Sequence, residues 1–305
     1  MRAAYTEANG GPDDLKVGDL PTPEPGPTEI LVRNHAAGVG PWDWKMMAGK
    51  WMPLKFPHIP GSEAAGVVEQ APEGSDFKVG DEVWGRVHHA YAEYVVSDGA
   101  TLVTKPAEVS FEEAAGLVIA ASTAYEGIVD RLQLQSAESI IVTSAAGGVG
   151  SAAVQIAAST GARVIGVASA ANHDFVRSLG AAEMFDYHDT GWPDAVREAV
   201  PGGADAFFDS AGGETGQAAL KALRDGGRAS FVAFPNPELA VEGRGITGEF
   251  FSANGTHERF EAINKLIEDG KLKPQVAEIM PLQQAREALQ KNQQGHTRGK
   301  IVLKT

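Results

Sequence analysis

The chain has 305 residues, with 26 lysines and arginines against 40 aspartates and glutamates, so its formal charge is −14. It contains no cysteine, which excludes disulfides, thiolate catalysis, cysteine-ligated zinc and iron–sulfur clusters. A hydrophobic share of 43% excludes a disordered or collagen-like chain, and the acidic balance disfavours nucleic acid as a partner. At about 150 residues per domain, the length favours two domains or one large α/β unit.

The chain also carries no pattern typical of membrane or secreted proteins. Its first seven residues lack the apolar core of a signal peptide, and no uninterrupted apolar run approaches the roughly 18–20 residues of a membrane span. We therefore expect a cytoplasmic protein that binds neither membranes nor nucleic acid.

Short apolar runs separated by glycine and proline fill the first third of the chain. The proline-dense stretch 21–27 cannot be the interior of a helix. Such short strands with turn residues between them predict a small barrel-like or sandwich domain. The strands are expected at residues 29–39, 64–69, 81–87 and 92–96.

The pattern changes near residue 110. Ser110 and Glu113 have the spacing of a capping box, which predicts the start of a helix. From residue 139 onward, strand-like and helix-like stretches alternate, and this alternation predicts an α/β fold with a doubly wound parallel sheet. Strands are expected at 139–143, 163–168, 183–187, 206–209 and 228–234, and helices at 150–160 and 174–179.

The last 50 residues contain two helix-like stretches, at about 257–269 and 282–292, and a closing strand at 300–303. A strand that follows a completed sheet must pair elsewhere, so we expect the chain to return to the first domain. The expected domains are a substrate domain at 1–115, a nucleotide-binding domain at 116–255 and a C-terminal return at 256–305.

The segment after the strand at 139–143 is a glycine turn. Ala145-x-Gly147-x-x-Gly150 is a G-x-G-x-x-G pattern with alanine in place of the first glycine. Gly147 would let backbone N–H groups approach a pyrophosphate, and Gly150 would let the following helix pack closely on the strand. The alternative is a glycine-rich turn without a ligand. The strand before the turn and the helix after it favour a dinucleotide.

The end of the second strand of this domain bears on the choice of coenzyme. Residues 167–173 contain no acid before Asp174. An acid there would repel a 2′-phosphate, so its absence favours NADPH over NAD(H). Ser169, Asn172 and His173 could hydrogen-bond that phosphate, with Arg177 one turn further. The alternative for these residues is an exposed polar helix start.

Several motifs occur in an order and spacing that match one enzyme superfamily over nearly the whole chain. They include Pro57-x-Ile59-Pro60-Gly61-Ser62-Glu63, Gly80-Asp81-Glu82-Val83-Trp84-Gly85, Thr123-Ala124-Tyr125, the glycine turn and Gly299-Lys300-Ile301-Val302-Leu303. The chain resembles the medium-chain dehydrogenase/reductase superfamily, specifically its zinc-free quinone oxidoreductase (zeta-crystallin-like) branch. Relatives often carry asparagine where this chain has Gly40.

The resemblance implies a GroES-like β-rich domain with an inserted Rossmann domain, and a cofactor in the cleft between them. It implies NADPH-dependent reduction of quinones or other α,β-unsaturated carbonyls without a metal. It also implies a homodimer joined through the Rossmann sheets, to which residues 244–251 would contribute. The implied cofactor contacts are Thr123, Gly147, Gly148, Val149, Ser169, Asn172, Tyr187, Phe234 and Lys300, and Phe251 would contact the substrate.

An aromatic and methionine cluster precedes residue 57 and suits a flat quinone or enone. Its members are Trp42, Trp44, Met46, Met47, Trp51, Met52 and Phe56. Core packing is the alternative for about half of them, and Trp42 and Trp51 are the better candidates for a substrate pocket.

No general acid stands out. Asp43 and Tyr91 are weak candidates for catalysis. Asp43 has the alternative role of capping a helix that starts near Trp44, and Tyr91 that of packing in a strand. Solvent could supply the proton instead.

We expect no zinc. The alcohol dehydrogenases of the superfamily use cysteine and histidine as ligands, and this chain has no cysteine and eight scattered histidines. Only His88 and His89 are adjacent, and neighbours in a strand point to opposite faces.

Two other functions remain open. One is an enoyl reductase acting on a thioester, a haloacrylate or a biosynthetic intermediate. The other is a dinucleotide-binding sensor or structural protein without turnover. A panel of 1,4-quinones, linear enones and enoyl thioesters would separate the enoyl reductase from a quinone or enone reductase. Oxidation of bound NADPH by any acceptor would separate both enzymes from the protein without turnover.

Overall fold

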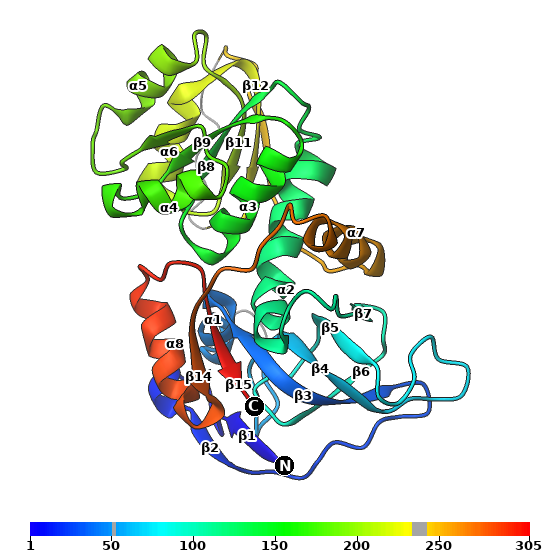
Figure 1. Cartoon of the computed structure of the whole chain (residues 1–305). Helices are drawn as coiled ribbons and strands as arrows, with labels where there is room; N and C mark the ends of the chain where they lie inside the picture. Colours follow the sequence, from blue (N-terminus) through cyan, green and yellow to red (C-terminus); the bar gives the residue numbers. More distant parts are fainter. Residues whose placement is uncertain (51–52, 234–242) are drawn as a thin grey trace. The chain divides into compact units, whose positions relative to one another are not determined.

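The chain folds into two units that exchange segments near the C-terminus (Figure 1). The computed structural model describes residues 1–50, 53–233 and 243–305. Unit 1 comprises Met1–Ile119, Gly255–Glu268 and Pro274–Thr305, and unit 2 comprises Ala120–Asn254 and Asp269–Lys273. Our assignment of the first unit to the substrate and of the second to the nucleotide stays a prediction.

Unit 1 is built on a sheet of seven strands in the order β14-β15-β3-β4-β5-β7, with β6 paired to β3. The strands are β3 (Ile30–Val39), β4 (Glu63–Gln70), β5 (Glu82–Arg86), β6 (Tyr94–Ser97), β7 (Leu102–Thr104), β14 (Val276–Pro281) and β15 (Lys300–Lys304). The closing strand β15 lies between β14 and β3 and runs antiparallel to β3 (Figure 1). The C-terminal segment therefore returns to the sheet of the first third, as the sequence predicts.

Short elements cover this sheet. The hairpin strands β1 (Arg2–Tyr5) and β2 (Lys16–Asp19) pair with each other, and helix α8 (Ala285–Gln294) packs against β15 and against α1 (Pro41–Met47). The buried faces of these elements form one apolar core. Its members include Val32, Val83, Leu102, Leu289 and Leu303.

Helix α7 (His257–Glu268) belongs to unit 1 although it follows the unit 2 sheet in sequence. Its Asn264 is 6% exposed and makes two hydrogen bonds to the N-terminal strands. The indole N–H of Trp84 donates to Asn264 Oδ1 at 3.0 Å, and Asn264 Nδ2 donates to the carbonyl of Thr104 at 3.0 Å. This side chain therefore ties α7 to β5 and β7.

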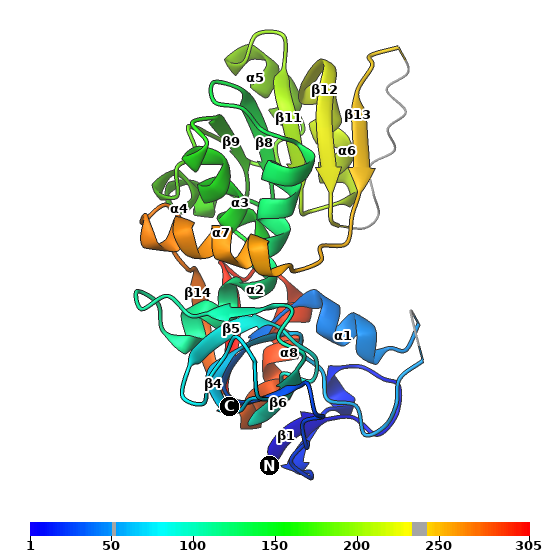
Figure 2. The same cartoon turned by 90° about the vertical axis from the view of Figure 1, so that its right-hand side faces the viewer.

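Unit 2 contains a parallel sheet of six strands in the order β10-β9-β8-β11-β12-β13, of which Figure 2 shows the β11–β13 side. The strands are β8 (Ser139–Thr143), β9 (Arg163–Val167), β10 (Glu183–Phe185), β11 (Ala204–Asp209), β12 (Leu223–Phe231) and β13 (Thr247–Phe250). Parallel strands that are covered on both faces have nearly continuous apolar sequences, as in Ile140–Val142. The predicted α/β class with a doubly wound parallel sheet is confirmed.

The helices of unit 2 follow the strands in alternation. They are α3 (Gly148–Ser159), α4 (His173–Ser178), α5 (Trp192–Ala199) and α6 (Gly213–Ala222). From β8 the chain first moves through β9 to β10, and it then crosses to β11 and moves the other way to β12. Because the crossovers between parallel strands are right-handed, α3 and α4 lie on one face of the sheet and α5 and α6 on the other. The crevice between β8 and β11 is where such sheets bind ligands, at the carboxyl ends of the strands.

Helix α2 (Phe111–Tyr125) begins with the predicted capping box, and a π-helical segment, η2 (Glu126–Arg131), follows it. The N–H of Ser110 donates to Glu113 Oε2 at 2.9 Å, and the N–H of Glu113 donates to Ser110 Oγ at 3.1 Å. Among the described residues, no helix is both long enough and apolar enough to span a membrane.

The two buried bonds of Asn264 generate a prediction on stability. Asn264→Ala leaves the Trp84 N–H without its acceptor, and we expect it to lower the free energy of unfolding by about 1–3 kcal/mol. Chemical denaturation measures this loss. Glu261→Ala, on the exposed side of the same helix, is the control. Equal stability of both variants and the wild type would contradict the role of Asn264.

Candidate active site

The glycine turn joins β8 to α3, and its conformation requires glycine at position 150. Ser144 has a left-handed backbone (φ +50°), and its carbonyl accepts the N–H of Gly147 at 2.9 Å. A Cβ on Gly150 would lie 2.0 Å from the carbonyl oxygen of Ser144, so any other residue there would displace the helix. The N–H of Ala145 donates to the carbonyl of Val167 at 3.1 Å and fastens the turn to β9.

The start of α3 fits a dinucleotide pyrophosphate. The first amides of a helix have no partner within the helix, and here they belong to Gly148, Val149 and Gly150. The first turn carries no acidic side chain, so the positive end of the helix dipole is unopposed. A Cβ on Gly147 would lie 3.1 Å from Ser144 Oγ, a tight contact that glycine avoids at the residue before the helix.

The residues expected at the adenosine phosphate lie together after β9 and β10. Asn172 ends the short helix η3 (Ala170–Asn172), and its Nδ2 donates to Oγ of Ser169, the residue before the helix, at 3.1 Å. The ring of Tyr187 lies against that of His188, with centroids 4.1 Å apart. The structure therefore brings Ser169 and Asn172 into contact.

An acid that the sequence analysis missed joins this corner. Asp186, after β10, accepts the N–H of Ala170 at 3.0 Å and pairs with His188 Nδ1 at 2.7 Å. These bonds lower the pKa of the Asp186 carboxyl, with the N–H of His188 as the largest cause, so the group stays charged. The sequence has no acid directly after β9, as expected. In the folded chain, however, Asp186 from the end of β10 lies beside the loop that follows β9.

The residues expected near the nicotinamide lie on different elements, and one of them is outside the described residues. Thr123 is buried near the end of α2, and Phe234 lies outside the described residues. Phe251 is 4% exposed, and the guanidinium of Arg131 lies 4.5 Å from its ring centroid. A contact of Phe251 with the substrate therefore stays a prediction. Lys300 belongs to unit 1.

Asp43 and Tyr91 form a hydrogen-bonded pair in unit 1. Helix α1 begins at Pro41 rather than near Trp44, so Asp43 is its third residue. Asp43 Oδ2 accepts the N–H of Gly40 at 2.8 Å and the phenol O–H of Tyr91 at 2.8 Å. Asp43 is therefore not the N-cap residue, and from the third helical position its carboxylate instead satisfies the N–H of the N-cap residue Gly40.

A second buried carboxylate, which the sequence analysis did not single out, lies beside this pair. Lys300 Nζ donates to Glu63 Oε1 at 2.5 Å, and the N–H of Ile119 donates to Glu63 Oε2 at 3.0 Å. Glu63 is almost fully buried, whereas the Lys300 side chain keeps 11% of its surface exposed. The signal that could have identified Glu63 is a charged residue at the head of the apolar strand β4.

Gly40 leaves a polar recess in this cluster. A Cβ at Gly40 would lie 3.6 Å from both Glu63 Oε1 and Lys300 Nζ and 3.9 Å from Asp43 Oδ2. These are ordinary contact distances, so one further carbon atom would fit at Gly40 in contact with all three groups. Its nearest neighbours are two carboxylate oxygens and one ammonium nitrogen.

Burial changes the acidity of this cluster. Loss of water raises the pKa of Asp43 to about 6, with further increase from the charge of Glu63, although the bonds from Gly40 and Tyr91 oppose the rise. Burial and the neighbouring Asp43 raise the pKa of Tyr91, which therefore stays a neutral donor. Asp43 can exchange a proton near neutral pH, which an ordinary aspartate does not do.

The predicted tryptophans have different environments. Trp42 is 39% exposed on α1, as a substrate contact requires, whereas Trp44 packs on the core and donates its indole N–H to Asn292 Oδ1 at 3.1 Å. Trp51 lies outside the described residues.

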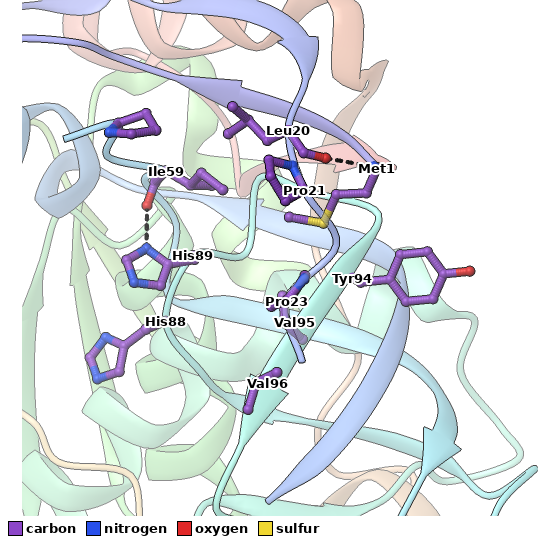
Figure 3. A pocket seen from close by; sticks show the side chains of 11 residues that line it. Met1, Leu20, Pro21, Pro23, Ile59, His88, His89, Tyr94, Val95 and Val96 are labelled. Atoms are coloured by element: carbon purple, nitrogen blue, oxygen red, sulfur yellow. Dashed lines mark hydrogen bonds between the residues drawn. The ribbon is translucent and has the colours of Figure 1, made fainter. Parts of the chain in front are cut away.

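A largely apolar pocket of about 260 Å³ lies elsewhere in unit 1 (Figure 3). His88 and His89 both line it, and His89 Nδ1 bonds the carbonyl of Ile59 at 2.9 Å. The expectation that these neighbours point to opposite faces is wrong, because they follow β5 and His89 has a left-handed backbone (φ +63°). Within the described part of the chain, no three potential ligands are arranged to hold a metal.

The chain is similar to known proteins over its whole length. The family described as alcohol dehydrogenase GroES-like domain matches residues 26–107, and that described as zinc-binding dehydrogenase matches residues 179–303. The quinone oxidoreductase of Homo sapiens is 31% identical and covers 99% of this chain and 97% of its own.

Two solved structures extend this similarity. An NAD-dependent alcohol dehydrogenase has a TM-score of 0.94 and 33% identity, covering 100% of both chains. A mycobacterial protein in complex with NADPH has a TM-score of 0.90 and 28% identity, also covering 100% of both chains. The matches confirm the predicted fold class, a GroES-like β-rich part with a Rossmann doubly wound parallel sheet.

The environment of Asp43 predicts how stability depends on pH. Its pKa rises from 3.8 in the unfolded chain to about 6 on folding, so the folded state binds its proton more tightly. The wild type therefore loses stability relative to Asp43→Asn as pH rises from about 4 to 7, by up to about 3 kcal/mol.

Denaturation of both proteins across this pH range measures the difference. Asp14→Asn is the matched control, because Asp14 accepts the equivalent bond from Gly11 at 2.8 Å on an exposed surface. A difference between wild type and Asp43→Asn that stays constant with pH would contradict the raised pKa.

Proposed function

The chain belongs to the medium-chain dehydrogenase/reductase superfamily, with quinone oxidoreductase-like relatives over its full length, and on that premise we propose an NADPH-dependent reductase of quinones or other α,β-unsaturated carbonyls. The observation that carries the proposal is the glycine turn at the start of α3, where Gly150 closely approaches the Ser144 carbonyl and the first helical turn carries no acidic side chain. When bound, the nicotinamide supplies the hydride.

We assign the stabilisation of the acceptor to the recess at Gly40. Hydride addition to a conjugated carbonyl moves an electron pair onto its oxygen, which then needs a donor. Lys300 Nζ lies at this recess and is oriented by Glu63, so its ammonium can donate to the developing oxyanion. Lys300 also remains a candidate for contact with the cofactor.

Asp43 is the candidate source of the proton that completes the product. Its raised pKa of about 6 keeps a fraction protonated near neutral pH, and Tyr91 holds its Oδ2 in place. Because Asp43 is 4% exposed, the proton would reach the product through the recess or through water. Tyr91 is fully buried, which favours a positioning role over direct contact with substrate.

NADPH is the coenzyme that we propose, and NADH is the alternative. Support for NADPH comes from the hydroxyl and amide of Ser169 and Asn172 at the end of β9 and from the relative that binds NADPH. The carboxylate of Asp186 opposes a 2′-phosphate at this corner and favours NADH.

We also propose a homodimer joined through β13, the last strand of the unit 2 sheet. Its residues are exposed or half-buried, and Phe250 presents a large apolar side chain at this edge. Among the described residues β13 pairs on one side only, with β12, and such a sheet edge is a template for a second copy. Light scattering of the purified protein tests the assembly. A cytoplasmic location likewise stays a prediction.

The acceptor reaction generates a direct prediction. We expect the wild type to oxidise NADPH with 1,4-quinones or linear enones faster than with enoyl thioesters. Lys300→Met should lower kcat about 100-fold or more through loss of the oxyanion donor. The double variant Glu63→Gln, Lys300→Met removes the unpaired buried charge and should stay equally slow.

Spectrophotometric assays that follow the loss of the absorbance band of reduced nicotinamide measure these rates. Lys304→Ala, an exposed lysine on the same strand, is the control. Preference for enoyl thioesters would favour the enoyl reductase instead. Failure of every acceptor to oxidise bound NADPH would leave only the non-catalytic role.

The Asp186 carboxylate predicts a change in coenzyme preference. Asp186→Asn should raise the preference for NADPH over NADH roughly three- to tenfold, because it removes a negative charge that faces the phosphate. The effect should shrink with added salt, since the corner is exposed. Comparison of kcat/KM for both coenzymes measures it, with Asp189→Asn as the control. An unchanged ratio would exclude Asp186 from the coenzyme corner.

A further inference from the structure

The two central strands of unit 2 stay connected beyond the end of their backbone pairing. The register of β8 and β11 ends at Val142 and Phe208. One residue further, Thr143 Oγ1 donates to Asp209 Oδ1 at 2.6 Å. Ser210, the residue after β11, also bonds Thr143. Its N–H donates to Thr143 Oγ1 at 3.2 Å, and its Oγ donates to the Thr143 carbonyl at 2.9 Å.

Burial of the Asp209 carboxylate costs free energy unless both of its oxygens accept hydrogen bonds. Asp209 is 0% exposed, and its Oδ1 also accepts the N–H groups of Ala211 and Gly212, each at 3.0 Å. Its Oδ2 has no hydrogen-bond partner among the described residues. A half-satisfied buried carboxylate costs free energy, and such exceptions concentrate at functional sites.

The position of this link connects it to the glycine turn. Thr143 immediately precedes Ser144, whose left-handed backbone starts the turn and whose carbonyl faces Gly150. On the β9 side, the turn is held by the bond from Ala145 to Val167. On the β11 side, where the two strands separate, the hydroxyl of Thr143 and the carboxylate of Asp209 provide the connection.

We propose that Asp209, acting through Thr143, is a positioning residue that holds the Ser144–Gly150 turn in its cofactor-binding shape, a role that rests on the proposed cofactor binding. The carboxylate takes three donors on one oxygen and thereby orients the end of β8 relative to β11. Loss of this link lets Ser144 relax from its left-handed conformation, which moves its carbonyl and the first amides of α3. Cofactor binding then includes the cost of ordering the turn, so the cofactor binds more weakly.

A double-mutant cycle tests the coupling. The variants are Asp209→Asn, which keeps the shape, Thr143→Val, and the two combined. We expect each single variant to weaken NADPH binding about tenfold or more and the double variant to bind no more weakly than either single one, since both changes break one link. Thr143→Ser keeps the hydroxyl and should restore binding to within about threefold of the wild type.

Two further readouts separate positioning from general stability. Hydrogen exchange should accelerate at residues 144–150 in the variants while β12 keeps its protection. Thr160→Val removes a hydroxyl that bonds the Ala157 carbonyl at 2.8 Å at the far end of α3, and it should leave NADPH binding unchanged.

The outcomes are distinguishable. A wild type that binds neither coenzyme overturns the proposed function. A wild type that binds NADPH, with folded Asp209→Asn and Thr143→Val variants that bind within twofold of it, overturns the positioning role alone.

Discussion

The contact between one carbonyl oxygen and one glycine determines what unit 2 can bind. The Ser144 carbonyl occupies the space that a side chain at position 150 would need, with only 2.0 Å between the oxygen and a Cβ there. This approach brings α3 against the end of β8, and the first amides of α3 have no partner within the helix. The left-handed Ser144, the bond from Ala145 to Val167 and the link to Asp209 all serve this one geometry.

Buried charge marks the second half of the proposed chemistry. A chain of formal charge −14 places Asp43 and Glu63 together in unit 1, where Lys300 bonds Glu63 and the charge of Arg86 also acts on Glu63. Such a cluster is stable only because backbone and phenol donors satisfy its oxygens, and the remaining imbalance appears as the raised pKa of Asp43. The recess at Gly40 lies beside the ammonium group of Lys300, which is why we propose it as the place for a developing oxyanion.

The sequence predicts features that depend on neighbours along the chain. The alternation of buried strands and helices, the turn at Gly147 and Gly150 and the capping box at Ser110 are local patterns, and each lies where expected. The contacts that could not be predicted join distant segments. Lys300 and Glu63 are 237 residues apart and meet through the pairing of β15, β3 and β4. Asp186 similarly reaches the loop after β9 from the end of β10, and β14 is too exposed to carry an apolar pattern.

A calorimetric titration of NADPH into the wild type and into Gly150→Val tests the central claim most directly. We predict saturable binding to the wild type and none to the variant, while circular dichroism shows that the variant keeps its helices. Binding of equal strength to a folded Gly150→Val protein would contradict the account. So would a wild type into which neither coenzyme titrates at millimolar concentration.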